Sequence, residues 1–201
     1  MYFVAKSSGE TNRNSQRAYV SYAGTGLGSR MVQGQPIASS PWTGQQIFLS
    51  FANSGDTPAR KAVIRTNVQD WPEDLPEGYD FPLDPKKVEA VIGPKANYAT
   101  EMVIDKEKLD QNAHAKGRIF IWGDVMYRDI FPDDPARLSE SCIEITYLTV
   151  GWVNPPADKS LATDIDAPNT QLVGFQSNAC KQHNCYDKDC KDYDDRVKDM
   201  Q

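Results

Sequence analysis

The stretch 47–68 constrains the fold most, because two strand-like segments flank one short turn within it. Apolar side chains recur with the two-residue period of a β-strand at Ile47, Leu49 and Phe51, and again at Ala62, Ile64 and Val68. The intervening segment contains Asn53 and Gly55, residue types that turns favour. The pattern predicts a β-hairpin with one buried face, in which Asn53 and Gly55 have conformational roles.

Length and composition favour a single folded domain. The chain has 201 residues, enough to bury a core without covalent cross-links. Residues 6–16 are almost entirely polar, so residues 1–16 are interpreted as an arm apart from the folded domain. Residues 17–152 are predicted to form a β-sandwich domain, and residues 153–201 an irregular, Cys-containing segment with a charged tail.

Further strands are predicted where β-branched and aromatic residues cluster, at 17–23, 88–92, 99–104, 118–127 and 142–152. Residues 70–85 carry four prolines, which indicates an irregular loop. Residues 105–115 are the one good helical candidate. About seven strands with one short helix predict an all-β protein built as an antiparallel β-sandwich.

The charge distribution argues against nucleic acid or an anionic membrane surface as a partner. The formal net charge is −6 at pH 7, and the Lys and Arg residues are scattered rather than gathered into a basic stripe. No window approaches the roughly 18 apolar residues that a membrane-spanning helix needs. The segment Met1–Ala5 is too short to be the core of a signal peptide.

Four motifs occur in order along the chain: Arg17–Val20, Phe51–Ala59, Gly123–Phe131, and the evenly spaced Cys180, Cys185 and Cys190. Together they resemble the extracytoplasmic part of a family of bacterial membrane-anchored proteins that has no assigned activity. The turn from Asn53 to Ala59 also resembles that of immunoglobulin-like β-sandwich domains from bacterial surface and periplasmic proteins. The resemblance implies an immunoglobulin-like fold and a periplasmic or extracellular location. It also implies anchoring to the inner membrane by helices of a longer protein, with residues 1–16 as the remnant of the stalk that follows those helices. It transfers no catalytic residue.

The four cysteines are Cys142, Cys180, Cys185 and Cys190, an even number that predicts two disulfides in an oxidising compartment. Sequence alone permits three pairings. Cys142–Cys180 with Cys185–Cys190 is favoured, because it tethers the unpatterned segment 153–179. Two alternatives stay open: a zinc site of Cys180, His183, Cys185 and Cys190, whose spacing is unusual for zinc, and free thiols in a cytosolic protein.

The sequence offers little for catalysis. It has two histidines, His114 in a polar segment and His183 among the cysteines, and no Gly-x-Ser-x-Gly motif. Acidic residues are too numerous at 124–134 for their spacing to single out a catalytic pair: Asp124, Asp129, Asp133 and Asp134. We therefore expect no enzymatic activity, no cofactor and no metal.

The proline-rich loop is the candidate contact site. It contains Trp71, Tyr79 and Phe81, and aromatic side chains are favoured at binding sites. The competing interpretation, which the residue pattern favours, is that these rings fold back onto the domain. At the end of another strand, a structural role for Tyr127–Asp129 is favoured over a contact role, with Tyr127 in the core and Arg128 paired to an acid.

The combined prediction is a non-catalytic binding or assembly module of a bacterial envelope protein. Its partner is expected to be a protein or another envelope component, membrane contact is expected only through an anchor missing from this sequence, and homo-oligomerisation stays open. One alternative is a subunit of a surface filament or adhesin, whose N-terminal arm is ordered by a neighbouring subunit. Another is a periplasmic or secreted hydrolase that uses carboxylates from 70–85 and 124–134.

Overall fold

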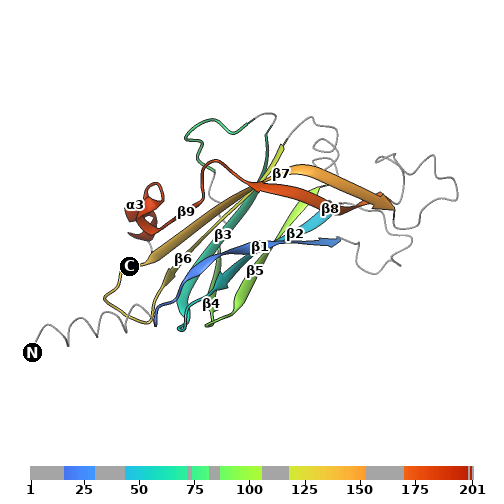
Figure 1. The fold of residues 1–201 in the computed structure, drawn as a ribbon. Coiled ribbons are helices and arrows are strands. Elements are labelled where there is room, and N and C mark those ends of the chain that lie inside the picture. The colour runs from blue at the N-terminus through green and yellow to red at the C-terminus, as the bar shows by residue number, and fades with distance from the viewer. Residues whose placement is uncertain are drawn as a thin grey trace, which may run out of the picture.

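The computed structural model describes residues 16–29, 44–71, 74–81, 87–105, 118–152, 170–198 and 200. Antiparallel strands dominate these ranges (Figure 1). The strands are β1 (Val20–Ser29), β2 (Gly44–Asn53), β3 (Ala59–Trp71), β4 (Val88–Ile92), β5 (Asn97–Asp105), β6 (Arg118–Arg128), β7 (Arg137–Trp152), β8 (Thr170–Ala179) and β9 (Cys185–Tyr186). They are followed by a short 3₁₀ turn, η2 (Asp187–Asp189), and a helix, α3 (Tyr193–Lys198).

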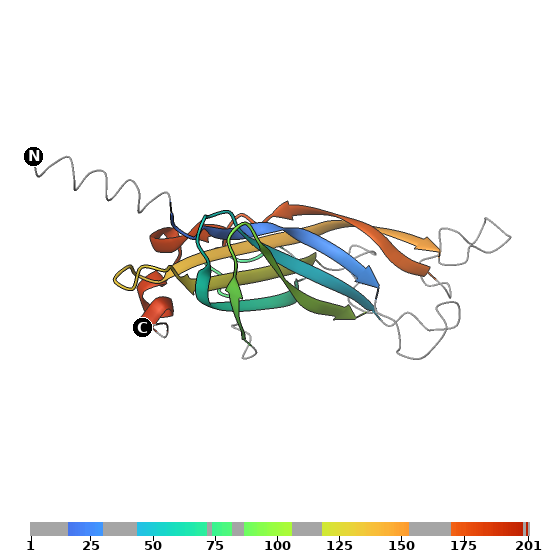
Figure 2. The same cartoon turned by 90° about the horizontal axis from the view of Figure 1, so that it is seen from below.

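Two antiparallel sheets face each other. The smaller sheet has the order β1-β2-β5, and the larger has the order β4-β3-β6-β7-β8, with β9 paired to β7. Figure 2 shows the same arrangement from a second side. Because a single apolar core lies between the two sheets, the predicted antiparallel sandwich is confirmed.

The predicted hairpin of 47–68 is wrong, although both of its strands exist. β2 pairs with β1 and β5, whereas β3 pairs with β4 and β6, so the turn 54–58 carries the chain from one sheet to the other. The apolar sides of both strands still meet in one core, where Leu49 and Ile64 are buried. Alternation identifies the buried face of a strand, and it does not tell whether two such faces belong to one sheet or to opposing sheets.

A glycine permits close packing of the two sheets at the centre of the core. Gly123 lies on β6 between the buried Ile121 and Val125. A Cβ atom at this position would lie 2.4 Å from Leu49 Cδ2 and 3.2 Å from Phe51 Cζ. The absence of a side chain therefore allows β2 to pack closely against β6.

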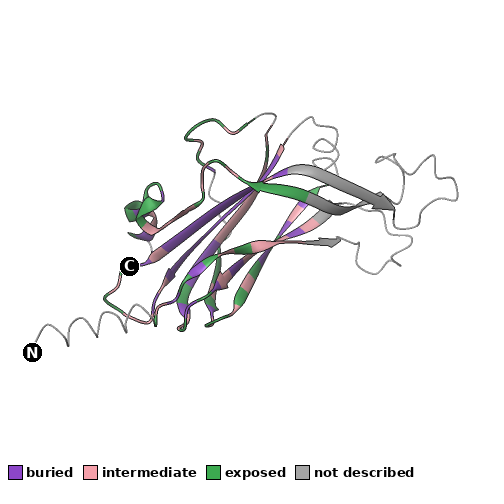
Figure 3. Ribbon diagram, viewed as in Figure 1, coloured by how far each residue is buried: buried purple, intermediate pink, exposed green. Residues whose placement is uncertain are grey.

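The outer face of the larger sheet is covered as well. Every residue from Ile119 to Tyr127 is buried (Figure 3). Near α3, Tyr193 and Val197 belong to one apolar cluster with residues of β3, β6 and β7. Farther along the sheet, Phe81 of the loop 74–81 packs in a second cluster over β6. This part of the molecule therefore has three layers: the small sheet, the large sheet and the covering segments.

The C-terminal part of the chain differs from its prediction. Residues 153–201 are expected to be irregular, yet β8 extends the larger sheet beside β7 and α3 buries two of its side chains. The described residues from 170 onward therefore belong to the sandwich. The predicted helix at 105–115 lies outside the described residues except for Asp105, which ends β5, and the predicted arm 1–16 lies outside them except for Gln16.

Candidate functional site

Alternate residues of three neighbouring strands form four rows across the outer face of the larger sheet. The pairing of β3, β6 and β7 places one residue of each strand in every row. In order from the α3 end, the rows are Val63–Met126–Leu138, Arg65–Asp124–Glu140, Asn67–Trp122–Cys142 and Gln69–Phe120–Glu144. Beneath the covering segments, the first row is therefore apolar and the second is charged. The third contains Trp122 and a disulfide cysteine, and the fourth is mixed.

The charged row is a buried ion network. Arg65 donates two hydrogen bonds to Asp124, from Nε to Oδ1 at 2.9 Å and from Nη2 to Oδ2 at 2.6 Å. Arg196 of α3 donates to both Asp124 and Glu140. Asp124 is 0% exposed and Glu140 is 6% exposed. Both carboxylates therefore depend on these cations in place of the water they lose on folding.

His183 completes the network from the turn that follows Cys180. Its Nδ1 lies 2.5 Å from Glu140 Oε1, and its Nε2 contacts the carbonyl oxygen of Tyr79. Because both partners are acceptors, this arrangement suits the protonated ring, the imidazolium, from which both nitrogens donate. The hydrogen bond to Glu140, opposed by burial, raises the pKa of His183. Burial raises the pKa of Glu140, but hydrogen bonds from His183 and Arg196 outweigh it and lower that pKa to about 2.

A pocket of about 500 Å³, which we call the loop pocket, lies between the loop 74–78 and the turn 180–182. The side-chain amide of Gln182 holds these two walls together. Its Nε2 donates to the carbonyl oxygen of Pro76 at 2.9 Å, and its Oε1 accepts from the backbone N–H of Gly78 at 3.0 Å. The disulfide of Cys180 fixes the start of the turn on β7. The pocket is therefore braced on both sides.

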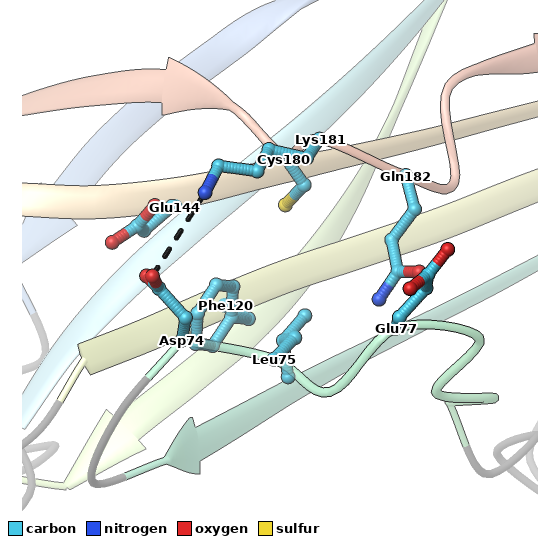
Figure 4. A pocket seen from close by; sticks show the side chains of 8 residues that line it. All are labelled: Asp74, Leu75, Glu77, Phe120, Glu144, Cys180, Lys181 and Gln182. Atoms are coloured by element: carbon cyan, nitrogen blue, oxygen red, sulfur yellow. Dashed lines mark ion pairs between the residues drawn. The ribbon is translucent and has the colours of Figure 1, made fainter.

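The loop pocket combines apolar and charged side chains. Figure 4 shows Phe120 and Leu75 between the two walls, and Lys181 reaching across to Asp74. The Lys181 Nζ to Asp74 Oδ2 distance is 3.9 Å, and the Lys181 side chain is 93% exposed, so this ion pair lies at the rim. The complete lining is Asp74, Leu75, Glu77, Phe120, Glu144, Cys180, Lys181 and Gln182.

The charges of the loop pocket leave a small negative excess. Arg118 lies beside the pocket and forms ion pairs with both Asp74 and Glu144. With Glu77, three carboxylates face the two cations Arg118 and Lys181. The arrangement therefore favours a ligand with an apolar body and a positively charged group.

A second, smaller pocket of about 180 Å³, which we call the inner pocket, lies beside the charged row. At its rim, Lys191 Nζ and Asp80 Oδ2 form an ion pair at 2.7 Å. Its lining is Asp80, Phe81, Trp122, Glu140, His183, Lys191, Asp192 and Arg196.

The four cysteines form the disulfides Cys142–Cys180 and Cys185–Cys190, which is the favoured pairing. The zinc alternative and the free-thiol alternative are therefore wrong, because no cysteine keeps a thiolate for a metal. In addition, the described ranges contain no group of three or more His, Cys, Asp or Glu residues arranged to hold a metal ion. Two disulfides indicate a non-cytoplasmic location.

The aromatic residues of the predicted contact loop pack on the sheet and on one another. Phe81 is 5% exposed and stacks on Trp122, with ring centroids 5.7 Å apart. Tyr79 lies between Phe81 and Trp71, at centroid distances of 5.3 and 4.9 Å. These contacts match the interpretation that the rings fold back onto the domain. The rings therefore anchor the loop 74–81 to the sheet, while other residues of this loop line the loop pocket.

The carboxylates of the predicted hydrolase are divided by the structure. Those of 70–85 reach the pockets, with Asp74 and Glu77 at the loop pocket and Asp80 at the inner pocket, whereas those of 124–134 line neither pocket. Asp124 is held in the ion network, Asp134 pairs with Arg17 at 2.8 Å, and Asp129 accepts a hydrogen bond from the backbone N–H of Ile130. Asp133 is exposed on the same turn. Their partners indicate structural roles for the buried members of this group.

The interpretation of Tyr127–Asp129 is correct in one part and wrong in another. Tyr127 is fully buried, as predicted, and its hydroxyl lies 2.6 Å from that of Tyr186. Arg128 does not pair with an acid in its described contacts, because its guanidinium donates to the carbonyl oxygens of Met200 and Pro132. This arginine caps the end of the C-terminal segment.

No protein-family model matches the chain, and comparisons with curated proteins and with solved structures also found no match. The resemblance to a membrane-anchored family therefore stays a prediction. Within the described ranges, no helix has the length and apolar character needed to span a bilayer.

The sequence prediction missed most residues of this face. Arg65 and Asp124 carry the one signal that was present, because each is a charged residue in a strongly β-forming segment, whereas Glu140 precedes the predicted strand 142–152. A charge within such a strand indicates either an exposed face or a buried partner. The partners Arg196 and His183 come from the C-terminal segment, where no local pattern points to them.

Proposed function

We propose that this chain is a non-catalytic binding module that works outside the cytoplasm, and that its ligand enters the loop pocket. The observation that carries the proposal is the bracing of this pocket by the Cys142–Cys180 disulfide and by the two hydrogen bonds of Gln182. Small-molecule and side-chain binding sites are concave, largely preformed and lined by apolar groups with a few polar ones. A pocket with fixed walls loses little conformational entropy on binding.

The lining defines the class of ligand. Phe120 and Leu75 favour an apolar or aromatic body, and the excess carboxylate charge favours an ammonium or guanidinium group. A basic side chain of a protein partner or a small amine has this chemistry. The chain's net charge of −6 adds long-range attraction for such a cation.

We further infer that the sandwich is immunoglobulin-like and belongs to a bacterial envelope protein. The order β1-β2-β5 opposite β4-β3-β6-β7 supports the first inference, because immunoglobulin-like domains divide about seven to nine strands between two antiparallel sheets in this manner. The disulfides support a secreted domain. The periplasmic or extracellular location and the membrane anchor rest on the sequence resemblance.

The ion network supports the non-catalytic part of the proposal. A general acid or base works best with a pKa near the working pH. Glu140 has a pKa of about 2, and both of its oxygens accept hydrogen bonds. Asp124 is also bound on both oxygens by arginines. For the hydrolase alternative, the loop pocket offers Asp74, Glu77 and Glu144, but Asp74 and Glu144 are both paired with Arg118. The filament alternative has no supporting observation in the described part of the chain.

Titration of the domain with benzylamine, followed by amide NMR, tests the proposal. Benzylamine joins an aromatic ring to an ammonium group, and benzyl alcohol is its uncharged counterpart. We expect benzylamine to shift the amide resonances of Leu75 and Gln182 in a saturable way, and benzyl alcohol to do so less. Glu77→Gln should weaken benzylamine binding, whereas Glu89→Gln, at an exposed position of β4, should not. Absence of saturable shifts at the pocket, or equal binding of both probes, contradicts the proposal.

A further inference from the structure

The inner pocket is bordered by two side chains that have unused hydrogen-bond donors. Within the described chain, the indole Nε1 of Trp122 and the guanidinium Nε of Arg196 are buried without a hydrogen-bond partner. Trp122 is 2% exposed, and both residues line the inner pocket. Indole and guanidinium N–H groups can only donate. A buried donor without a partner costs free energy, so an acceptor that reaches both groups would be stabilised.

The buried charges near the inner pocket do not balance. The cations are Arg65, Arg196 and the His183 imidazolium, and the anions are Asp124 and Glu140. One positive charge is therefore in excess within the buried network. Because charges interact more strongly away from water, this excess favours a monovalent anion.

The carboxylates at the rim of the inner pocket offset this excess only weakly. Asp80 forms an ion pair with Lys191 as well as acting on His183, and Asp192 is exposed. Water and salt screen an exposed carboxylate more than a buried one. The rings of Phe81 and Trp122 supply apolar wall, and the volume of about 180 Å³ suits a group of a few heavy atoms.

We propose that the inner pocket binds a carboxylate, whose oxygens accept hydrogen bonds from Trp122 Nε1 and Arg196 Nε and whose charge balances the buried network. The carboxylate belongs either to a small free acid or to the C-terminus of a peptide. This site is separate from the loop pocket, so it stands or falls independently of the proposed function. Side-chain adjustment at the wall brings the two donors into contact with the ligand.

Acetate is the probe for the first experiment. Sodium acetate is titrated against the full chain at about pH 6 and constant ionic strength, with sodium chloride as the counterpart. The indole N–H resonance of Trp122 and the backbone amide resonance of Phe81, at the pocket wall, are followed by NMR, and the Phe81 amide is the readout in variants that lack Trp122. We expect a saturable shift with acetate and not with chloride. In Trp122→Phe, which keeps a ring against Phe81 and removes the donor, the acetate Kd should rise about tenfold. Trp71→Phe, in the same aromatic group but outside the pocket lining, should leave the Kd unchanged.

Further probes identify the source of the carboxylate and provide the contradicting results. Tighter binding of N-acetylglycine than of acetate indicates a peptide C-terminus, and the reverse indicates a free acid. Acetamide, which lacks the charge, should not bind. His183→Asn removes one cation of the network and should also weaken acetate, which tests the site if Trp122→Phe does not fold. No saturable Trp122 shift up to about 100 mM acetate, or unchanged affinity in the folded Trp122→Phe and His183→Asn proteins, overturns the proposal.

Discussion

His183 joins three parts of the molecule through one side chain. Its imidazolium bridges Glu140 on β7 to the carbonyl oxygen of Tyr79 in the loop 74–81, and its own backbone belongs to the turn after the Cys180 disulfide. The φ angle of His183 is 63°, in the left-handed region that few side chains adopt without cost. The hydrogen bonds of the ring therefore help to maintain this backbone conformation. Because they depend on the charge of the imidazole, they also make the free energy of unfolding depend on the protonation of His183.

We expect the stability contribution of this pair to be greatest between about pH 4.5 and 6.5. The folded-state pKa of His183 is raised above its usual 6.5, so its contribution is complete below that pH and is lost as the pH rises through the folded pKa. The pKa of Glu140 is lowered from its usual 4.5 to about 2 in the folded state. Its contribution to stability is therefore present above pH 4.5 and is lost as the pH falls toward 2. Urea unfolding from about pH 2 to about pH 9 measures the loss of stability on both sides of this range.

The variant His183→Asn isolates the imidazole, because asparagine tolerates the left-handed backbone. It should cost about 1–3 kcal/mol at about pH 5.5, where Glu140 loses a charged donor. It should also remove most of the stability loss above about pH 6.5. His114→Asn, at the other histidine of the sequence, serves as the control. If His183→Asn keeps the wild-type pH dependence, the bridge does not couple protonation to folding.

The turn between β2 and β3 depends on the side chain of Asn53. Asn53 is 1% exposed, and its side-chain amide accepts from the backbone N–H groups of Tyr19 and Gly55 and donates to the carbonyl oxygens of Thr57, Ile92 and Gly93. One amide thus connects the segment before β1, the β2–β3 turn and the β4–β5 turn. Asn53 has the conformational role that the sequence predicts, with a wider reach than its own turn.

Gly55 is needed for a close backbone approach rather than for a left-handed φ. A Cβ atom at this position would lie 2.0 Å from the carbonyl oxygen of Arg17 and 2.8 Å from Ala18 Cα. Both are backbone atoms, which cannot rotate away. The predicted structural role therefore has a different cause from the one that the turn pattern indicates.

Gly55→Ala should accordingly lower the free energy of unfolding by about 1–3 kcal/mol or more, because the added methyl group forces the segment before β1 outward. Gly26→Ala on β1 is the matched control, since its Cβ would meet Phe48 Cβ at an ordinary 3.8 Å. Urea unfolding of both variants measures the difference. A neutral Gly55→Ala would show that the Arg17–Ala18 segment moves at no cost.

Most strand positions were predictable from the sequence, with β8 and β9 as exceptions, but strand neighbours were not. The alternation at 47–51 and the β-branched run at 118–127 depend on residues close in sequence, and both correspond to strands. Sheet membership depends on contacts between distant segments, which is why β2 and β3 were paired wrongly. The candidate site has the same dependence, since His183 meets Glu140 across 43 residues and Arg196 meets Asp124 across 72.

Across the whole molecule, the C-terminal segment is attached by two disulfides of different reach. Cys142–Cys180 joins the middle of β7 to the residue after β8, with a sequence separation of 38. Cys185–Cys190 closes a local loop with a separation of 5. The long disulfide also holds the turn that carries Gln182 and His183, so it positions one wall of the loop pocket and one cation of the network.

The long disulfide should therefore contribute more to stability than the short one. In the chain-entropy model, a loop of this length contributes about 4 kcal/mol and the short loop about 2 kcal/mol. Urea unfolding of Cys142→Ala/Cys180→Ala and of Cys185→Ala/Cys190→Ala, both without reductant, measures the two values.

The benzylamine titration separates this stability effect from a specific effect on the loop pocket. In Cys142→Ala/Cys180→Ala protein that is still folded, the turn 180–182 is no longer attached to β7 at Cys180. Ligand binding must then order this wall of the pocket, which costs conformational entropy, so benzylamine should bind more weakly. Cys185→Ala/Cys190→Ala should bind benzylamine as the wild type does, since neither residue lines the pocket. Equal loss of stability in the two variants, or unchanged binding without the long disulfide, would mean that hydrogen bonds of Gln182 and His183 alone hold the C-terminal turn in place.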